Sequence, residues 1–349
     1  MPADLAPPPA RLLRGRAAAG SSPEPRGPFS EILLAGLTRR RPLPAPPDRP
    51  DLGPLALVVD DDLQLALYCI HELAYRGFDD IDPDLEVDPE VHRWRVALEG
   101  AFEHALRALT AVEADRWRQD PLGLITAMGV DSGRSLSQEV LEDGDAEQFR
   151  EVLVHRSGYQ LKEADPHSWG IPRVGGVVKA ALVEIQMDEY GGGVPGRAHA
   201  DLFAATMQHA GLDPRYGAYL DRLPGITLAT TNLISLLGGR RRLLPALLGH
   251  LAMFENTSVG PMARWAAACD RFGLPAEARA FYDVHVVADA HHGPLARERM
   301  IGGLLAECPS AADDIVFGAA AGGLLEGLFA DHLRLAWAAG RTSLRDLDA

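Results

Sequence analysis

Residues 91–112 read VHRWRVALEGAFEHALRALTAV, and the repeat inside this stretch decides the fold class. Large apolar side chains recur in it at every third or fourth position: Trp94, Leu98, Phe102, Leu106 and Leu109. This spacing matches the 3.6-residue period of a helix, so the five side chains share one face. We expect an amphipathic helix that buries this face against other helices.

The helical period extends outward from this stretch in both directions. Asp60, Asp61 and Asp62 offer cap and first-turn acids to an apolar stripe that begins at Leu63. Residues 226–237 are ambiguous, because their β-branched side chains would also suit a strand. No alternating strand and helix units and no internal repeat are present, so the sequence predicts an all-α protein of stacked helices.

The chain divides by composition near residue 50. Residues 1–50 hold twelve of the 26 prolines and show little apolar periodicity, which predicts a flexible Pro/Arg-rich arm with room for a short helix around residues 29–37. Residues 51–349 are expected to form a single helical domain. Within it we expect N-terminal helices over residues 51–145 and a core over residues 146–345.

Charge and cysteine usage exclude several classes of protein. The net charge is −15, and residues 1–50 hold eight arginines against four acids, so the rest of the chain carries −19. This acidity argues against nucleic acid as a partner, and we interpret the basic run 240–242 as a solvated helix start or a docking point for one anion. Cys69, Cys269 and Cys308 form no metal or disulfide pattern, and no stretch suits a membrane span or signal peptide. A cytoplasmic protein is expected.

One segment carries a pattern typical of a metal site. In residues 281–293, the side chains of His285, Asp289 and His292 are spaced by four and then three positions. This spacing keeps them within about 60° of one another around a helix. Two imidazoles and a carboxylate on one face suit octahedral iron. The alternative is a coincidental polar stripe, since the chain has twelve histidines.

Further carboxylates and one histidine lie where they could join this triplet. Glu255 follows Leu251, Met253 and Phe254, and a carboxylate among apolar residues is costly to bury unless it is paired or bound to a metal. Three other candidates lie at the ends of predicted helices: Glu163, Glu189 and His199. Carboxylates can bridge two iron ions, while neutral imidazoles complete the shell without excess negative charge. Considered separately, each of these residues is more often a surface or helix-end residue than a metal ligand.

Several spaced motifs together resemble those of the iron-containing redox enzymes, a group of haem-oxygenase-like diiron oxidases and oxygenases. The motifs are YQLKEADPH at 159–167, EIQMDEYGGG at 184–193 with His199, the stretch 249–258, and His285-x3-Asp289-x2-His292. The similarity extends from about residue 55 to 344 and is strongest between His155 and His292.

The resemblance implies a haem-oxygenase-like seven-helix bundle with additional N-terminal helices, whose core binds two ferrous ions and no haem. Carried over by position, the family's ligands fall on Glu163, His199, Glu255, His285, Asp289 and His292, with Glu189 as an additional carboxylate. The implied activity is oxidation of a small molecule by dioxygen, through N-oxygenation, desaturation or C–C cleavage. An external electron donor is a further candidate partner, and so is a second copy of the chain in a homodimer.

The pair Gly293-Pro294 directly after His292 departs from an uninterrupted helix. Proline removes a backbone donor and disfavours helical geometry at the preceding residue, so we expect the helix to end here. If the helix frays before this point, His292 would bind metal weakly and the second iron would be labile or absent.

Three other interpretations stay open at this stage. The first is a mononuclear iron enzyme that uses only His285, Asp289 and His292. The second is a metal-free helical binding or scaffold protein of the same fold, and the third is a helical enzyme whose carboxylates pair with arginines. A separate stripe of Tyr68, His71, Glu72 and Tyr75 is interpreted either as pocket lining or as ordinary polar neighbours on a helix.

Overall fold

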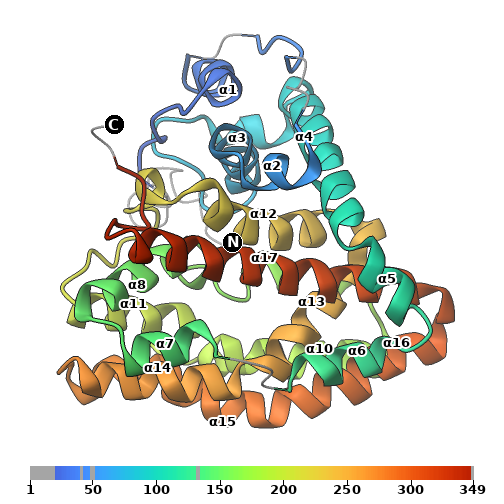
Figure 1. Ribbon diagram of the computed structural model, residues 1–349. Coiled ribbons are helices and arrows are strands. Elements are labelled where there is room, and N and C mark those ends of the chain that lie inside the picture. The colour runs from blue at the N-terminus through green and yellow to red at the C-terminus, as the bar shows by residue number, and fades with distance from the viewer. Residues whose placement is uncertain (1–19, 40–41, 48–51, 131–133, 347–349) are drawn as a thin grey trace, which may run out of the picture.

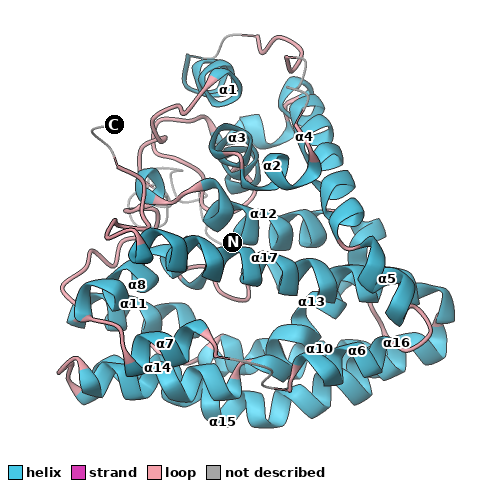
Figure 2. Ribbon diagram, viewed as in Figure 1, coloured by secondary structure: helices cyan, strands magenta, loops and turns pink. Residues whose placement is uncertain are grey.

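The fold was analysed in a computed structural model that describes residues 20–39, 42–47, 52–130 and 134–346. Within these ranges every regular element is helical and no strand occurs (Figure 2), which confirms the predicted all-α class. In the same ranges, each helix is too short or too polar for a membrane crossing.

The α-helices are α1 (Pro28–Arg39), α2 (Pro54–Val59), α3 (Asp61–Glu72), α4 (Pro89–Leu109), α5 (Ala111–Trp117), α6 (Pro121–Met128), α7 (Leu136–Glu142), α8 (Ala146–Gln160), α9 (Asp165–Ser168), α10 (Gly176–Glu189), α11 (His199–His209), α12 (Gly225–Gly239), α13 (Leu244–Thr257), α14 (Val259–Arg271), α15 (Ala280–Pro294), α16 (Gly302–Glu307) and α17 (Ala312–Ala338). Short 3₁₀ turns are η2 (Pro83–Val87), η3 (Ile171–Arg173), η4 (Gly191–Gly193), η5 (Leu220–Arg222), η6 (Arg241–Leu243), η7 (Ala276–Arg279) and η9 (Pro309–Ala311). One π-helical segment, η8 (Leu295–Ile301), continues α15.

The helices are stacked in successive levels, as Figure 1 shows. Helices α1 to α4 lie at the top of that view, α12 and α17 cross its middle, and α14 and α15 lie at the bottom. Direct packing links the levels, because α3 contacts α12, α12 contacts α17, and α13 contacts both α17 and α15. The division of the domain at residues 145 and 146 stays a prediction.

The predicted flexible arm is wrong for residues 20–39 and 42–47, which are packed against the domain. Helix α1 buries Phe29, Leu33 and Leu37 in the main apolar core. The carboxylate of Asp62, at the start of α3, accepts hydrogen bonds from the backbone N–H groups of Phe29 (2.8 Å) and Ser30 (2.7 Å). A buried apolar face and a carboxylate cap offset the ordering entropy that the proline content suggested. Residues 1–19, 40–41 and 48–50 lie outside the described residues.

Two ambiguous stretches of sequence have a definite structure. Residues 226–237 are part of helix α12, which is buried between α3 and α17 and therefore needs apolar side chains on most sides. The basic run that follows turns back onto α4, where Arg240 pairs with Glu99 and Arg242 pairs with Glu103. Two of the three arginines of the run thus neutralise acids within the protein.

Candidate metal centre

The residues proposed as ligands come from four helices and one turn, and the fold brings six of the seven together. Two groups have ligand atoms that all lie within 4.8 Å of one another. The first group consists of Glu163, Glu189, His199 and His285. The second group consists of Glu189, Glu255 and His292. Glu189 therefore belongs to both, and Asp289 belongs to neither.

The first group is built around two facing imidazoles. The rings of His199 and His285 have centroids 4.2 Å apart. Nδ1 of His199 lies 3.0 Å from Oε2 of Glu189, and Nε2 of His285 lies 3.6 Å from Oε1 of Glu163. His285 is oriented by its other nitrogen, because Nδ1 lies 2.6 Å from the carbonyl oxygen of Phe281 one turn earlier. An N–H donated there leaves Nε2 free to face the carboxylates.

The second group is centred on His292, whose side chain is completely buried. Its Nδ1 lies 3.3 Å from Oε2 of Glu255 and 3.8 Å from Oδ1 of Asp289. Its Nε2 lies 2.9 Å from Oδ2 of Asp188, so Asp188 orients the ring from outside. Asp289 stands at the edge of the group, where its Oδ2 accepts a hydrogen bond from the hydroxyl of Ser258.

The expected helix end at Gly293-Pro294 is wrong. Helix α15 includes both residues and continues without a break into the π-helical segment η8. Gly293 has a packing role, because a Cβ atom there would lie 3.0 Å from the carbonyl oxygen of Glu255. Gly293 thus lets α15 approach α13 closely and brings His292 beside Glu255.

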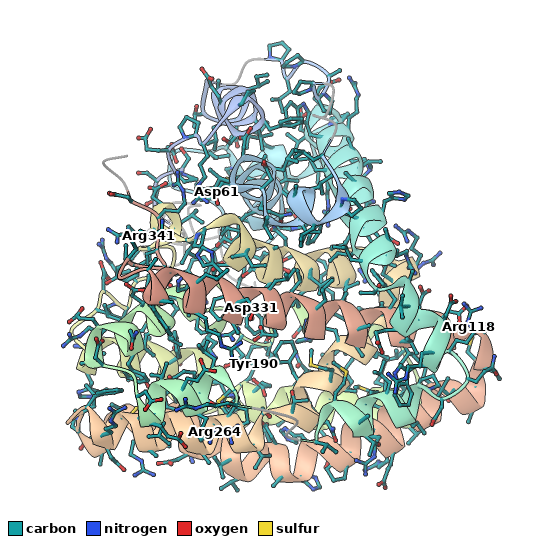
Figure 3. All side chains as sticks on the ribbon, in the orientation of Figure 1. Asp61, Arg118, Tyr190, Arg264, Asp331 and Arg341 are labelled. Carbon is teal, nitrogen blue, oxygen red and sulfur yellow. The ribbon has the colours of Figure 1, made fainter. Side chains whose placement is uncertain are left out.

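Tight turns place the remaining members of the first group. Three glycines, Gly191 to Gly193, have positive φ and form a compact turn between Glu189 and the start of α11 at His199. Tyr190, labelled in Figure 3, directly follows the last residue of α10, and its hydroxyl donates to Oδ1 of Asp165 over 2.9 Å. This bond ties the end of α10 to α9, next to the turn that carries Glu163.

The polar atoms of the two groups mainly face one another. Nδ1 of His199 and Nδ1 of His292 approach the carboxylates of Glu189 and Glu255 at 3.0 and 3.3 Å, but these contacts do not have hydrogen-bond geometry. Oε2 of Glu163 likewise has no hydrogen-bond partner within the described residues. Buried polar atoms without well-formed hydrogen bonds cost free energy, and native proteins rarely keep them without a functional reason. Three carboxylates and three imidazoles that converge in this way fit a pair of iron ions.

The buried carboxylates of the cluster also require positive charge near them. Burial, together with the charge of Asp289, outweighs the attraction of the neighbouring His292 and raises the pKa of Glu255 to about 8. Burial opposes protonation of His285, but the charge of Glu163 overcomes it and raises the His285 pKa to about 10. Protons thus balance the buried carboxylates, and metal cations would take over that role on binding.

Two neighbouring spaces border the cluster. A small chamber of about 60 Å³ is lined by Glu163, Glu189, Glu255, His285 and Asp289. A larger cavity of about 400 Å³ lies beside it, and the two share the walls Tyr159, Glu163, Phe254, Ser258 and Met262. A small molecule in the larger cavity would therefore lie next to the candidate metal ligands.

Sequence reasoning missed the outer partners and the cavity. Asp188 and Ser258 lie inside the motifs at residues 184–193 and 249–258, but neither has a spacing that separates it from an ordinary surface residue. The cavity walls come from helices far apart in sequence, including α8, α12, α13 and α17. Only the packing of these helices reveals it.

Comparison with known proteins identifies the family of the chain. The sequence profile of a family described as "iron-containing redox enzyme" matches residues 150–327, just over half of the chain and the part that holds every candidate ligand. The chain belongs to this family, and its helices form the all-α, haem-oxygenase-like fold that the sequence predicted.

One curated relative is nitrosourea synthase from Streptomyces achromogenes subsp. streptozoticus. It is 28% identical to this chain over 181 residues, which make up 51% of this chain and 38% of the relative. The chain thus matches less than half of that protein's length.

Proposed function

We propose that this chain is a non-haem diiron oxidase or oxygenase that activates dioxygen to oxidise a small molecule. The observation that carries the proposal is the pair of interlocking ligand groups that share Glu189. Because one carboxylate belongs to both groups, two ions held there would lie close together. Membership of the iron-containing redox enzymes makes ferrous iron the expected metal.

Some of the side chains would hold iron, and others would control the surroundings of the iron. Glu163, Glu189, His199 and His285 would hold one ion, and Glu189, Glu255 and His292 the other, with Asp289 as a further ligand beside His292. Ferrous ions bound there would supply the electrons that reduce dioxygen. The apolar walls Phe254 and Met262 keep bulk water away from the space between ligands and cavity.

The larger cavity is the proposed substrate site. It borders Glu163 directly, which would place a bound molecule next to the first ligand group. N-oxygenation, desaturation and C–C cleavage are all compatible with such a site. A nitrosourea contains an oxidised nitrogen, so the similarity to nitrosourea synthase makes N-oxygenation the first reaction to test.

The metal-free alternatives require different surroundings for the same residues. A scaffold protein would satisfy His285, Asp289 and His292 by ordinary hydrogen bonds in a packed interior, yet His285 and Asp289 line the 60 Å³ chamber, which shares walls with the 400 Å³ cavity. A metal-free enzyme would pair the carboxylates with arginines, whereas Glu163 and Glu255 face histidines. Both observations favour the proposed iron enzyme.

The test is anaerobic reconstitution of the apoprotein with ferrous iron, followed by an iron count per chain and by exposure to oxygen. We expect two irons per chain, a transient visible absorption band after oxygen is added, and loss of iron in Asp289→Ala. A count of one would favour the mononuclear alternative. Absence of bound iron, with Asp289→Ala indistinguishable from the parent, would contradict the proposal.

His291 offers a matched control on the same helix. It neighbours His292 in sequence, but its side chain is 65% exposed and contacts Glu184 at the surface. His291→Ala should bind iron like the parent protein. Equal losses in His291→Ala and Asp289→Ala would indicate damage to α15 rather than loss of a ligand.

A further inference from the structure

The turn that carries Glu163 has an unusual backbone. Glu163 lies between α8 and α9, and the next residue, Ala164, has φ +71°. Among the described residues other than glycine, only Ala164 has a positive φ. A left-handed conformation is unfavourable for an alanine because its Cβ crowds the following carbonyl oxygen, so surrounding contacts must hold the turn in place.

Those contacts come from three sides. Lys162, just before Glu163, places its Nζ 2.9 Å from Oε2 of Glu72 on α3. Arg76 donates to the carbonyl oxygen of Leu161 (3.1 Å), and Gln186 on α10 donates to the carbonyl oxygen of Ala164 (2.9 Å). The backbone on both sides of Glu163 is therefore fixed to distant helices.

The Lys162–Glu72 pair is completely enclosed. The two side chains are 1% and 0% exposed, and Nζ lies 4.8, 4.4 and 5.9 Å from the ring centroids of Tyr68, Tyr75 and Tyr216. Tyr216 also donates its hydroxyl to Oε2 of Glu72 over 2.7 Å. We call Lys162, Glu72 and these three tyrosines the Lys162 cage.

The cage accounts for most of the polar stripe at residues 68–75. None of Tyr68, His71, Glu72 and Tyr75 lines the 400 Å³ cavity, so these residues do not face the proposed substrate. His71 contacts Glu99 and Asn232 instead. The other three face Lys162.

Stability alone is a weak reason for such a pair. The free-energy cost of removing two charges from water offsets most of their mutual attraction. Replacing such a pair by apolar residues therefore often leaves the stability of a protein unchanged or increases it. The location of the pair is more informative, since Lys162 points to α3 while the adjacent Glu163 faces His285 across the chamber. A fixed Lys162 limits how far the Glu163 carboxylate can turn away.

We propose that the Lys162 cage is a positioning device for Glu163, which holds its carboxylate in the first ligand group and thereby raises the affinity of that group for metal. This inference rests on the proposed function, in which Glu163 is an iron ligand. Lys162 acts through the backbone of the turn and touches neither substrate nor metal.

The test is the double variant Lys162→Met/Glu72→Leu, which removes both charges and leaves neither one buried alone. Its apoprotein is titrated anaerobically with Co²⁺, and bound metal is followed by equilibrium dialysis and visible absorption. We expect a melting temperature near that of the parent. Binding at one of the two sites should be weaker by about 10- to 100-fold, as for other outer partners of metal ligands. A binding curve equal to that of the parent would overturn the proposal.

Tyr216→Phe is a milder variant that removes only the hydrogen bond to Glu72, so it stays informative if the double variant fails to fold. We expect weaker binding at the same site by about two- to tenfold, which corresponds to one lost hydrogen bond. Parent-like affinity in Tyr216→Phe would count against the cage.

Two controls separate the possible failures. Arg334→Met/Glu139→Leu makes the same change at a half-exposed pair between α17 and α7 and should leave Co²⁺ binding unchanged. Equal weakening there would contradict a specific role of the cage. Glu163→Gln removes the ligand itself: if it binds like the parent, the proposed metal site is wrong. If it loses one site while the cage variant keeps both, only the cage proposal is wrong.

Discussion

Glu189 has a special place among the candidate ligands, because it is common to both groups. At the residue scale this makes its carboxylate different from those of Glu163 and Glu255, each of which serves one group. The sequence offers no sign of this difference, since all three are acids near helix ends or among apolar residues. This difference between the three glutamates arises only when the chain folds around the turn at residues 191–193.

Glu189→Gln should therefore lower occupancy at both iron sites, whereas Glu163→Gln and Glu255→Gln should each lower one. The physical reason is that a neutral amide neither offsets the charge of two cations nor bridges them as a carboxylate does. Iron per chain after reconstitution and desalting measures the effect. Glu184→Gln, on the same helix but at the surface, is the control. Equal iron loss in the Glu189, Glu163 and Glu255 variants would contradict the shared role of Glu189.

At the scale of elements, the contact between α13 and α17 depends on two glycines. A Cβ on Gly249 would lie 2.2 Å from the carbonyl oxygen of Ile315, and a Cβ on Gly318 would lie 1.9 Å from that of Ala246. Neither distance is tolerated without backbone movement. The close approach fixes α13, which carries Glu255 and lines the cavity.

Gly318→Ala should consequently destabilise the protein by about 1–3 kcal/mol, the usual result of overpacking, as measured by urea unfolding. Gly327→Ala is the matched control on the same helix, since a Cβ there meets nothing within 4 Å. That change should be neutral or stabilise by about 0.5–1 kcal/mol, because alanine is the better helix former. Similar destabilisation by both variants would show that the close approach is not the cause.

At the scale of the whole molecule, the ligand cluster links helices from distant parts of the chain. The turn before α9 and the helices α10, α11, α13 and α15 all supply members, and several of these members are buried acids. Without a cation these carboxylates oppose one another, so the proposed metal site would come at a cost to the stability of the apoprotein.

Ferrous iron should raise the melting temperature measured anaerobically, since a ligand that binds only the folded state adds about 2.7 kcal/mol per site at a free concentration 100 times the Kd. A chelator should reverse the shift. Mg²⁺ at the same concentration should act more weakly, because it favours oxygen ligands and the cluster contains three imidazoles. An equal shift with Mg²⁺ would point to general charge neutralisation.

Local sequence determined the elements of this protein and the residue types of its candidate site. The 3.6-residue repeat of residues 91–112 and the spacing of His285, Asp289 and His292 follow from helix geometry, so they can be recognised without the fold. The prolines of residues 1–50 and the Gly293-Pro294 pair were misleading, because their effect depends on tertiary contacts with Asp62 and Glu255.

Only the tertiary structure decided how these parts combine. It joined Glu189 to two groups, left Asp289 at the edge, opened a cavity beside Glu163 and enclosed Lys162 among tyrosines from α3 and the 216 turn. Each of these features depends on distances between segments far apart in the chain. Such distances are set by how whole helix faces pack, and residue spacing within one helix does not contain that information.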